Sequence, residues 1–189
     1  MNAELINILK NNGIAIVATD TLYGVLGNAH SEAVVQHIYE LKGRDEDKPF
    51  IILIPDIGSL AQFGAVLSNT EKQKLAQYWP GAVTVIVPLA EAWREKFAYL
   101  HRGTNELAFR MPGKQSLLDL LKETGPLVAP SANPQGKEPA HTINEAQTYF
   151  GDEVDFYQDG GTVAGLPSTI IRLKDQHITI IRQGAVSVV

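Results

Sequence analysis

The chain alternates apolar runs of strand length with amphipathic segments of helix length, and this alternation limits the fold more than any other feature. The runs at 14–18, 50–54 and 83–87 are almost entirely apolar, as in strands that are buried on both faces. The segments at 3–12 and 31–41 place their apolar residues along one side of a helix. This order predicts an α/β protein with helices packed on a mixed sheet.

The second half continues the alternation and ends in strands. We expect strands at 107–110 and 127–129, with a helix at 116–123 between them. The last two apolar runs, at 168–173 and 177–182, are separated by the polar residues Lys174, Asp175 and Gln176, which is typical of an antiparallel pair joined by a turn.

Three residues are expected to begin helices. Ser31 is a plausible N-cap for the second helix, and Thr70 for a helix that runs to Tyr78. Thr142, with Glu145 three residues later, has the signature of a capping box. The helix after it is expected to reach residue 150.

Composition limits the class of protein. A chain of 189 residues without an internal repeat or linker is expected to form one domain, 1–189. It has no cysteine, which excludes disulfides, thiolate metal sites and cysteine nucleophiles. No apolar run is long enough to cross a membrane, and the N-terminus lacks the pattern of a secretion signal. We therefore expect a cytoplasmic protein without a membrane partner.

Three cations lie close together between the second helix and the second strand. Lys42, Arg44 and Lys48 fall within seven residues, directly before Pro49. Arginine can bind phosphate with two hydrogen bonds, and lysine adds a mobile charge, so the cluster suits a polyphosphate. A charged surface loop is the alternative for this segment alone. The net charge of -5 counts against a protein that coats nucleic acid.

Other strand ends carry small polar residues, which on such folds often form the site. The segment 19–24 offers hydroxyl groups and an aromatic ring, and either lines a polar pocket or forms a capping turn. Arg110 either caps a helix or binds a carboxylate. Residues 129–133 offer hydroxyl, amide and backbone donors to an anion. For residues 79–81, a structural role as a rigid turn before a strand is favoured over a functional role.

Several familiar site motifs are absent from the sequence. It has no glycine-rich phosphate loop, no dinucleotide-binding fingerprint and no nucleophile elbow around a serine. Its five histidines lack the spacing of metal ligands, so structural or surface roles are expected for them.

Taken together and in order, these segments resemble the YrdC family, the threonylcarbamoyl-AMP synthases. The resemblance covers roughly residues 14 to 185. The motifs that carry it are Thr19 to Gly24, Lys42 to Pro49, Trp79 to Gly81, Arg110 to Pro112, Ser131 to Asn133, Ser168-Thr169 and Arg182 to Gly184. Because the chain stops at Val189, it resembles the short, single-domain branch of the family.

The resemblance implies a nucleotidyltransferase that joins L-threonine, bicarbonate and ATP into L-threonylcarbamoyladenylate and releases pyrophosphate. The product would serve threonylcarbamoyladenosine formation in tRNA, so tRNA and a downstream transferase complex are implied partners. The implied fold is a twisted, open mixed sheet flanked by helices, with a basic concave face. Mg²⁺ would be held mainly by the ATP phosphates, with no metal site made by the protein.

Site residues follow from the resemblance motif by motif. Those expected to bind ATP are Lys42, Arg44, Lys48, Ser131, Asn133 and Arg182. Those expected to bind threonine are Thr21, Tyr23, Arg110, Ala129 and Ser168, with Arg110 on the carboxylate. No protein nucleophile is implied, so positioning and electrostatics would supply catalysis, with Lys42, Arg44 and Lys48 foremost.

Four positions depart from the family pattern. Ala18 replaces a proline, and Gln135 replaces a serine. Leu53 stands where some members carry a histidine that contacts threonine, so that contact should be lost. Arg172 stands where an acidic residue is frequent.

Two rival functions stay open from the sequence. One is a non-catalytic module that binds double-stranded RNA or tRNA on the same basic face. The other is a paralogue that has lost the activity. Intact Lys-x-Arg and Ser-Ala-Asn motifs count against the second.

Overall fold

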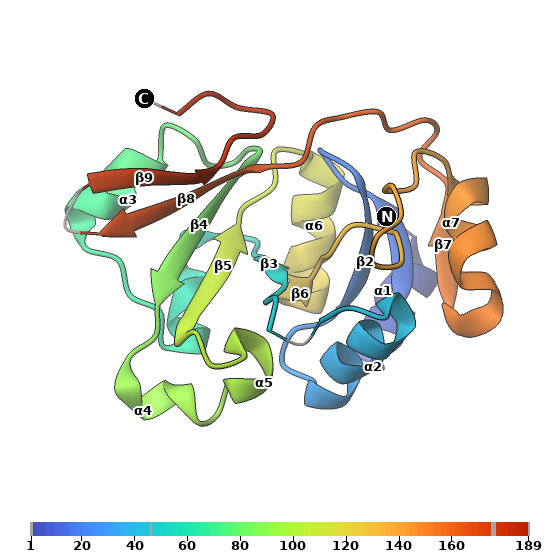
Figure 1. Ribbon diagram of the computed structural model, residues 1–189, viewed down its shortest axis with the longest axis horizontal. Coiled ribbons are helices and arrows are strands. Elements are labelled where there is room, and N and C mark those ends of the chain that lie inside the picture. Colours follow the sequence, from blue (N-terminus) through green and yellow to red (C-terminus); the bar gives the residue numbers. More distant parts are fainter. Residues whose placement is uncertain (1, 46, 175–176, 189) are drawn as a thin grey trace.

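Within the described residues, a mixed, nine-stranded sheet forms the centre of the protein (Figure 1). The structure is a computed structural model that describes residues 2–45, 47–174 and 177–188. The strands lie in the order β7-β1-β2-β6-β3-β5-β4-β8-β9. Their bounds are β1 Ala15–Ala18, β2 Tyr23–Asn28, β3 Ile51–Leu53, β4 Val83–Pro88, β5 Glu106–Arg110, β6 Leu127–Val128, β7 Phe156–Gln158, β8 Thr169–Lys174 and β9 His177–Arg182. The pairs β1–β7, β3–β5 and β4–β8 are parallel and the other pairs are antiparallel, which confirms the predicted mixed α/β sheet.

Helices cover both faces of the sheet. Their bounds are α1 Ala3–Lys10, α2 Glu32–Lys42, α3 Asn69–Leu75, α4 Glu91–Arg94, α5 Ala98–His101, α6 Gln115–Thr124 and α7 Ile143–Phe150, with 3₁₀ turns η1 at Ile57–Phe63 and η2 at Gly151–Glu153. The leucines of α1 and α6 pack on one face against Val17, Leu26 and Leu53. A larger core on the other face joins α2, α5 and α7 to β2, β4 and β5.

The predicted elements are present, and one predicted cap is wrong. Ser31 caps α2 and Thr142 caps α7, as expected, with the side chain of each accepting from a backbone N–H three residues on. The expected capping box differs in its second contact, because the Glu145 side chain accepts from the N–H of His141 instead of that of Thr142. Thr70 does not cap α3. Ser68 does, and its hydroxyl and Glu71 form a reciprocal capping box. The β8–β9 pair is antiparallel as predicted, although Asp175 and Gln176 of its turn lie outside the described residues.

The strand β2 was not predicted, because its two glycines interrupt the apolar pattern. One of them, Gly27, is required by packing. A Cβ atom there would lie 2.5 Å from Cγ1 of Val34 and 2.8 Å from Cδ1 of Ile38, so α2 could not pack as closely on β2. With β2 in place, the turn 19–22 is held between two adjacent antiparallel strands.

A long connection without regular secondary structure, residues 159–168, joins β7 to β8 and is called the strap below. In Figure 1 it runs along the top of the molecule, from the side of β7 and α7 to the β8–β9 hairpin. It therefore passes over strand ends from both halves of the sheet. None of the helices in the described ranges is long and apolar enough to span a membrane.

Candidate active site

A cavity of about 530 Å³ lies under the strap, among the ends of β1, β3, β5 and β6. Most of the predicted site residues line it, although they come from segments far apart in the sequence. These residues are Thr21, Tyr23, Arg44, Arg110, Ala129, Ser131, Ser168 and Arg182. Lys42, Lys48 and Asn133 do not line it. The predicted residues therefore converge, with three exceptions.

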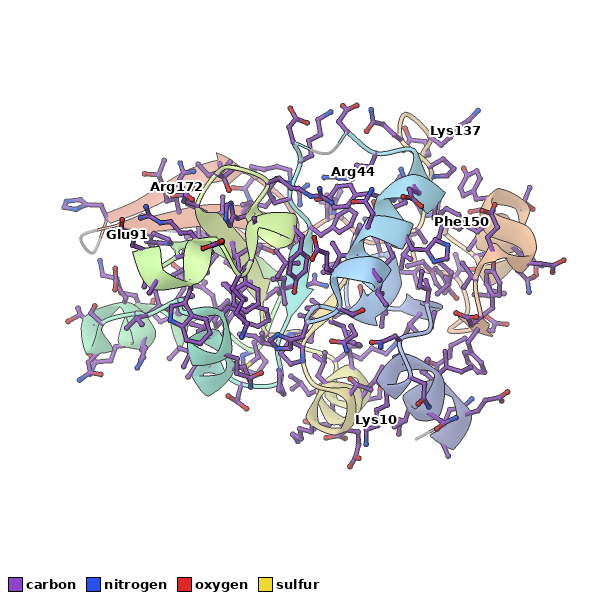
Figure 2. All side chains as sticks on the ribbon, turned by 90° about the horizontal axis from the view of Figure 1, so that it is seen from below. Lys10, Arg44, Glu91, Lys137, Phe150 and Arg172 are labelled. Atoms are coloured by element: carbon purple, nitrogen blue, oxygen red, sulfur yellow. The ribbon has the colours of Figure 1, made fainter. Side chains whose placement is uncertain are left out.

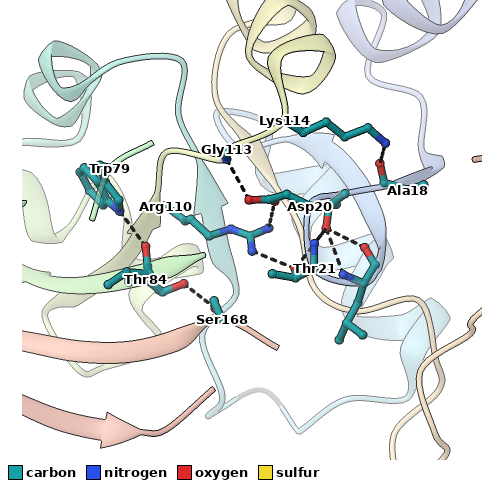
Figure 3. Close-up of polar contacts among 12 residues, drawn as sticks. Ala18, Asp20, Thr21, Trp79, Thr84, Arg110, Gly113, Lys114 and Ser168 are labelled. Atoms are coloured by element: carbon teal, nitrogen blue, oxygen red, sulfur yellow. Dashed lines mark hydrogen bonds and ion pairs between the residues drawn. The ribbon is translucent and has the colours of Figure 1, made fainter. Parts of the chain in front are cut away.

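Arg110 is the most buried charge in the cavity wall, with 4% of its surface exposed. Figure 3 shows its guanidinium group between Asp20 and Thr21. Its Nη2 atom lies 3.3 Å from Oδ1 of Asp20, and its Nη1 atom donates to Oγ1 of Thr21 at 2.8 Å. The other carboxylate oxygen of Asp20 accepts from the backbone N–H of Gly113. Asp20 thus fixes the orientation of Arg110.

Arg110 lines the cavity and keeps one donor without a partner in the described part of the chain. Burial, the main cause, lowers its pKa, Asp20 raises the pKa again, and Arg182 nearby lowers it further. An arginine nevertheless stays protonated in proteins. Its Nε is buried and has no hydrogen-bond partner among the described residues. An uncompensated donor of this kind is suited to a ligand carboxylate.

Hydroxyl groups form a directed chain beside Arg110. The Thr19 hydroxyl donates to the carbonyl of Leu22 at 2.6 Å, so the 3.1 Å contact between Thr21 and Thr19 has Thr21 as the donor. The Thr21 oxygen therefore accepts from Arg110 while its hydrogen points to Thr19. Thr19 also lines the cavity, as expected for the segment 19–24, although it was not among the residues expected to bind a substrate.

Ser168 and Arg182 form another part of the cavity wall. The Ser168 hydroxyl lies 2.7 Å from that of Thr84, a buried residue of β4 (Figure 3). Nη2 of Arg182 donates to the backbone carbonyl of Ser168 at 2.8 Å. Arg182 is more exposed than Arg110, and burial lowers its pKa from the ordinary value. Arg182 thus lines the cavity and contacts Ser168 through its guanidinium group.

Arg44 lies in the loop after α2 and lines the cavity, and contacts with Lys48 and Phe50 hold its side chain in place. Its Nε donates to the carbonyl of Lys48 at 3.1 Å, and its guanidinium carbon lies 5.4 Å from the ring centre of Phe50. That ring is itself stacked on Tyr39, with ring centres 4.0 Å apart. The terminal nitrogens of Arg44 have no protein partner within the described ranges, so they can bind an anion in the cavity.

Lys48 and Asn133 are placed differently from the expectation. The Lys48 ammonium group pairs with Asp45 on the outer side of the loop, and about half of each side chain is exposed. The side-chain amide of Asn133 donates to the carbonyls of Pro134 and Lys137, while its oxygen accepts from the Ser131 hydroxyl. Asn133 therefore orders its own loop. Lys48 would have to leave Asp45 to reach a ligand in the cavity.

Lys42 also departs from the expectation of a phosphate contact. Only 2% of its surface is exposed. Its Nζ donates to the backbone carbonyl of Ser131 at 2.5 Å and to that of Asn133. Burial, and then the charge of Arg44, lower its pKa from 10.5 to about 7. Lys42 thus lies behind the cavity wall and contacts the loop that forms it.

This placement predicts a pH dependence of stability. Between pH 7 and 10.5 the unfolded chain binds more protons at Lys42 than the folded one, so the free energy of unfolding should rise with pH. The contribution of this one group has a slope of at most about 1.4 kcal/mol per pH unit. Urea unfolding of the wild type and Lys42→Met at pH 7.0, 8.0 and 9.0 should show the slope in the wild type only. Parallel curves would contradict the burial of an ionisable amine at this position.

The strap closes the cavity through several backbone contacts. The hydroxyl of Tyr23, which is fully buried, donates to the carbonyl of Gly161 and accepts from the N–H of Gly160. Burial is the main cause that raises the pKa of Tyr23. The ring therefore walls the cavity, as expected, while the hydroxyl is used to hold the strap. Gly165 lies so close to Thr21 that a Cβ atom would be 2.3 Å from its carbonyl oxygen.

The cavity also contains Glu138 and His141, which sequence reasoning did not single out. His141 donates from Nδ1 to the carbonyl of Val163 in the strap at 2.9 Å. Both residues sit in a Pro- and Gly-containing loop without a recognisable pattern, so only the fold could reveal them. No group of three or more His, Asp or Glu side chains suited to a metal ion occurs among the described residues.

The four departures from the family pattern have local structural partners. The carbonyl of Ala18 accepts from Lys114, and Arg172 pairs with Glu106 at 2.7 Å. Leu53 is fully buried among the leucines of α1 and α6 and does not line the cavity. Gln135 accepts through Oε1 from the backbone N–H of Asp45 at 2.8 Å, which joins the loop after α2 to the loop after β6.

Comparisons with known proteins agree with this geometry. The Sua5/YciO/YrdC family model, described as "Telomere recombination", matches residues 7–184. The threonylcarbamoyl-AMP synthase of Bacillus subtilis is 32% identical over 98% of this chain and 54% of its own length. A putative threonylcarbamoyl-AMP synthase of Mycobacterium leprae is 30% identical over 98% of this chain and 84% of its own.

A solved structure is similar over nearly the whole chain. It is the crystal structure of Pyrococcus abyssi Sua5 complexed with L-threonine, which has a TM-score of 0.86 and 28% sequence identity. The match covers 96% of this chain and 53% of the Sua5 chain. The present chain thus spans about half the length of the Bacillus and Pyrococcus relatives.

Proposed function

The chain belongs to the Sua5/YciO/YrdC family, and on that premise we propose that it is an L-threonylcarbamoyladenylate synthase. Its substrates would be L-threonine, bicarbonate and ATP, and its products the adenylate and pyrophosphate. The observation that carries this proposal is the convergence of Arg110 and Thr21 with Arg44 and Arg182 on one cavity. Relatives named as threonylcarbamoyl-AMP synthases and the threonine complex of Pyrococcus abyssi Sua5 support it.

Threonine would lie at the closed end of the cavity. Its carboxylate would pair with Arg110, which Asp20 already orients. Thr21, Ser168 and the backbone at Ala129 would surround the rest of the amino acid, and the ring of Tyr23 would exclude water on one side. Burial makes each of these contacts stronger than it would be in water.

ATP would lie toward the open end, beside Arg44, Ser131 and Arg182. Bicarbonate would take up a proton and release water to give CO₂, and the neutral threonine amine would add to the CO₂ and lose a proton to form a carbamate. A carbamate oxygen would then attack the α-phosphorus, and the bond from that phosphorus to the bridging oxygen would break as pyrophosphate leaves. Arg44 and Arg182 would neutralise the charge that grows on the pyrophosphate. The protein would act by positioning and electrostatics, without a covalent intermediate.

Mg²⁺ fits this arrangement as an ion held mainly by the ATP phosphates. Glu138 is the carboxylate among the described lining residues, and one carboxylate plus phosphates and water is a usual magnesium environment. When bound, the ion would add to the neutralisation of the phosphate charge. We also propose a cytoplasmic location, with tRNA and a threonylcarbamoyl transferase complex downstream.

The test is pyrophosphate release by the purified protein with ATP, L-threonine, bicarbonate and Mg²⁺. We expect release only when all of the substrates are present, and the adenylate as the product in mass spectrometry. The alternative, a non-catalytic module for double-stranded RNA or tRNA, predicts RNA binding without any release. If no pyrophosphate is released, separate isothermal titrations with ATP and with threonine would show which of the two substrates the protein does not bind.

A further inference from the structure

The ammonium group of Lys42 contacts neither the cavity nor solvent. It lies behind the wall, 2% exposed, with the backbone carbonyls of Ser131 and Asn133 as its partners. Ser131 lines the cavity and Lys42 does not. The hydrogen bonds of the ammonium group are therefore made to the protein backbone rather than to a ligand.

Both carbonyls belong to one loop, residues 131–137, which presents Ser131 to the cavity. On one side this loop is fixed to β2, because the N–H of Ala132 donates to the carbonyl of Tyr23 at 2.8 Å. On the other side the N–H of Gln135 donates to the carbonyl of Lys42 itself at 2.8 Å. Lys42 thus holds the 131–137 loop through its side chain and its backbone.

The same residue stands next to the loop that carries Arg44. Lys42 is the last residue of α2, and the left-handed Gly43 ends the helix. The side chain of Gln135 accepts from the N–H of Asp45, which ties the two loops together a second time. Lys42 therefore connects the loop that carries Arg44 to the loop that carries Ser131, and in this way sets the relative position of the two residues.

A side chain that donates hydrogen bonds suits this position better than an apolar one would. Two carbonyl oxygens directed at one point repel each other, and an ammonium group can donate to both at once. The carbonyl end of a helix also favours a positive charge. A side chain without a donor would leave the carbonyl of Asn133 unsatisfied in a buried place, where polar groups are normally paired. The carbonyl of Ser131 would keep only the N–H of Asn133 as a partner among the described residues, at 3.0 Å.

We propose that Lys42 is a positioning residue, whose buried ammonium group holds the 131–137 loop and thereby sets Ser131 in register with Arg44 for the nucleotide. The functional part of this inference rests on the proposed function, since it assumes that these two residues bind ATP. The structural part concerns the protein without any ligand, and the two parts can be tested separately.

The first test is amide hydrogen exchange in the nucleotide-free protein, comparing wild type with Lys42→Met. Loss of a charge-assisted hydrogen bond should speed exchange of the 131–137 amides by at least about 10-fold. The matched control is Lys137→Met, which removes an exposed ammonium group from the same loop (Figure 2) and should leave exchange unchanged. Unchanged exchange in Lys42→Met would overturn the proposal, because a direct phosphate ligand has no such effect without nucleotide.

The second test is titration of the same variants with ATP and with threonine. Lys42→Met should weaken ATP binding by about 10-fold or more and leave threonine binding within about 2-fold, because Lys42 touches none of the proposed threonine contacts. Faster exchange with unchanged ATP binding would overturn the functional part. If the wild type itself releases no pyrophosphate, the proposed function fails, while the exchange result still decides what Lys42 holds.

A second variant covers the case in which Lys42→Met does not fold. Lys42→Gln keeps two N–H donors, although its side chain is one bond shorter than that of lysine. We expect a smaller acceleration in the same amides and a smaller loss of ATP affinity. A loss of ATP affinity with wild-type exchange in Lys42→Gln would again identify a direct ligand and overturn the proposal.

Discussion

Replacing Arg44 by alanine should lower pyrophosphate release by at least about 100-fold, the usual effect of removing one donor from a developing negative charge. Arg44 is the cation of the loop after α2 that lines the cavity, and its Nε and ring contacts hold the guanidinium group in place before a ligand arrives. The protein should stay folded, because Arg44 lies on a partly exposed loop rather than in the core. Circular dichroism and the thermal midpoint would check this.

The matched variant is Lys48→Ala, in the same loop. The family motif predicts that both cations bind the phosphates. In the structure they are separated, because Lys48 does not line the cavity and its ammonium group pairs with Asp45. An exposed pair of this kind contributes little to stability. We expect a loss of activity below about 10-fold, since Lys48 contributes at most a mobile charge. Equal losses in the two variants would show that the loop rearranges when ATP binds.

The fold was predictable because strands such as β1 and β3 are largely buried on both faces. Apolar runs such as 14–18 and 50–54 leave few alternatives in a chain with helices between them. The prediction failed for β2, where packing against α2 requires Gly27 and removes the apolar signal. The cap at Ser68 was missed because only Thr70 was considered, although Ser68 lies two residues earlier and has Glu71 three residues on, as a capping box requires.

Most of the site residues could be predicted from the sequence, but the contacts that each of them makes could not. Motif order identified Arg110, Ser168 and Arg182, which do meet in the cavity. It could not distinguish a lysine that faces a ligand from one that holds backbone carbonyls, because both occur as the same residue in the same motif. That distinction depends on the path of the 131–137 loop, which lies about 90 residues further along the chain. The partnership of Asp20 with Arg110 is hidden for the same reason.

Replacing Arg110 by methionine should abolish threonine binding while leaving ATP binding nearly intact. The guanidinium group is the buried cation that Asp20 and Thr21 orient, and two charge-assisted hydrogen bonds to a carboxylate contribute about 3–6 kcal/mol together. Titration should therefore show threonine affinity lower by at least about 100-fold. ATP affinity should change by less than about 3-fold, because Arg44 and Ser131 stay in place and Arg182 loses only a neighbouring like charge.

Arg110→Met should also destabilise the protein, and this effect must be separated from the loss of threonine binding. Removing Arg110 leaves the mostly buried carboxylate of Asp20 without its ion pair, which costs about 3–5 kcal/mol in comparable cases. The double variant Asp20→Asn/Arg110→Met removes both charges and keeps an oxygen for the N–H of Gly113. It should unfold at a higher temperature than Arg110→Met and bind threonine equally poorly. If the double variant recovers threonine binding, the loss in the single variant came from misfolding around Asp20, and Arg110 is not the carboxylate ligand.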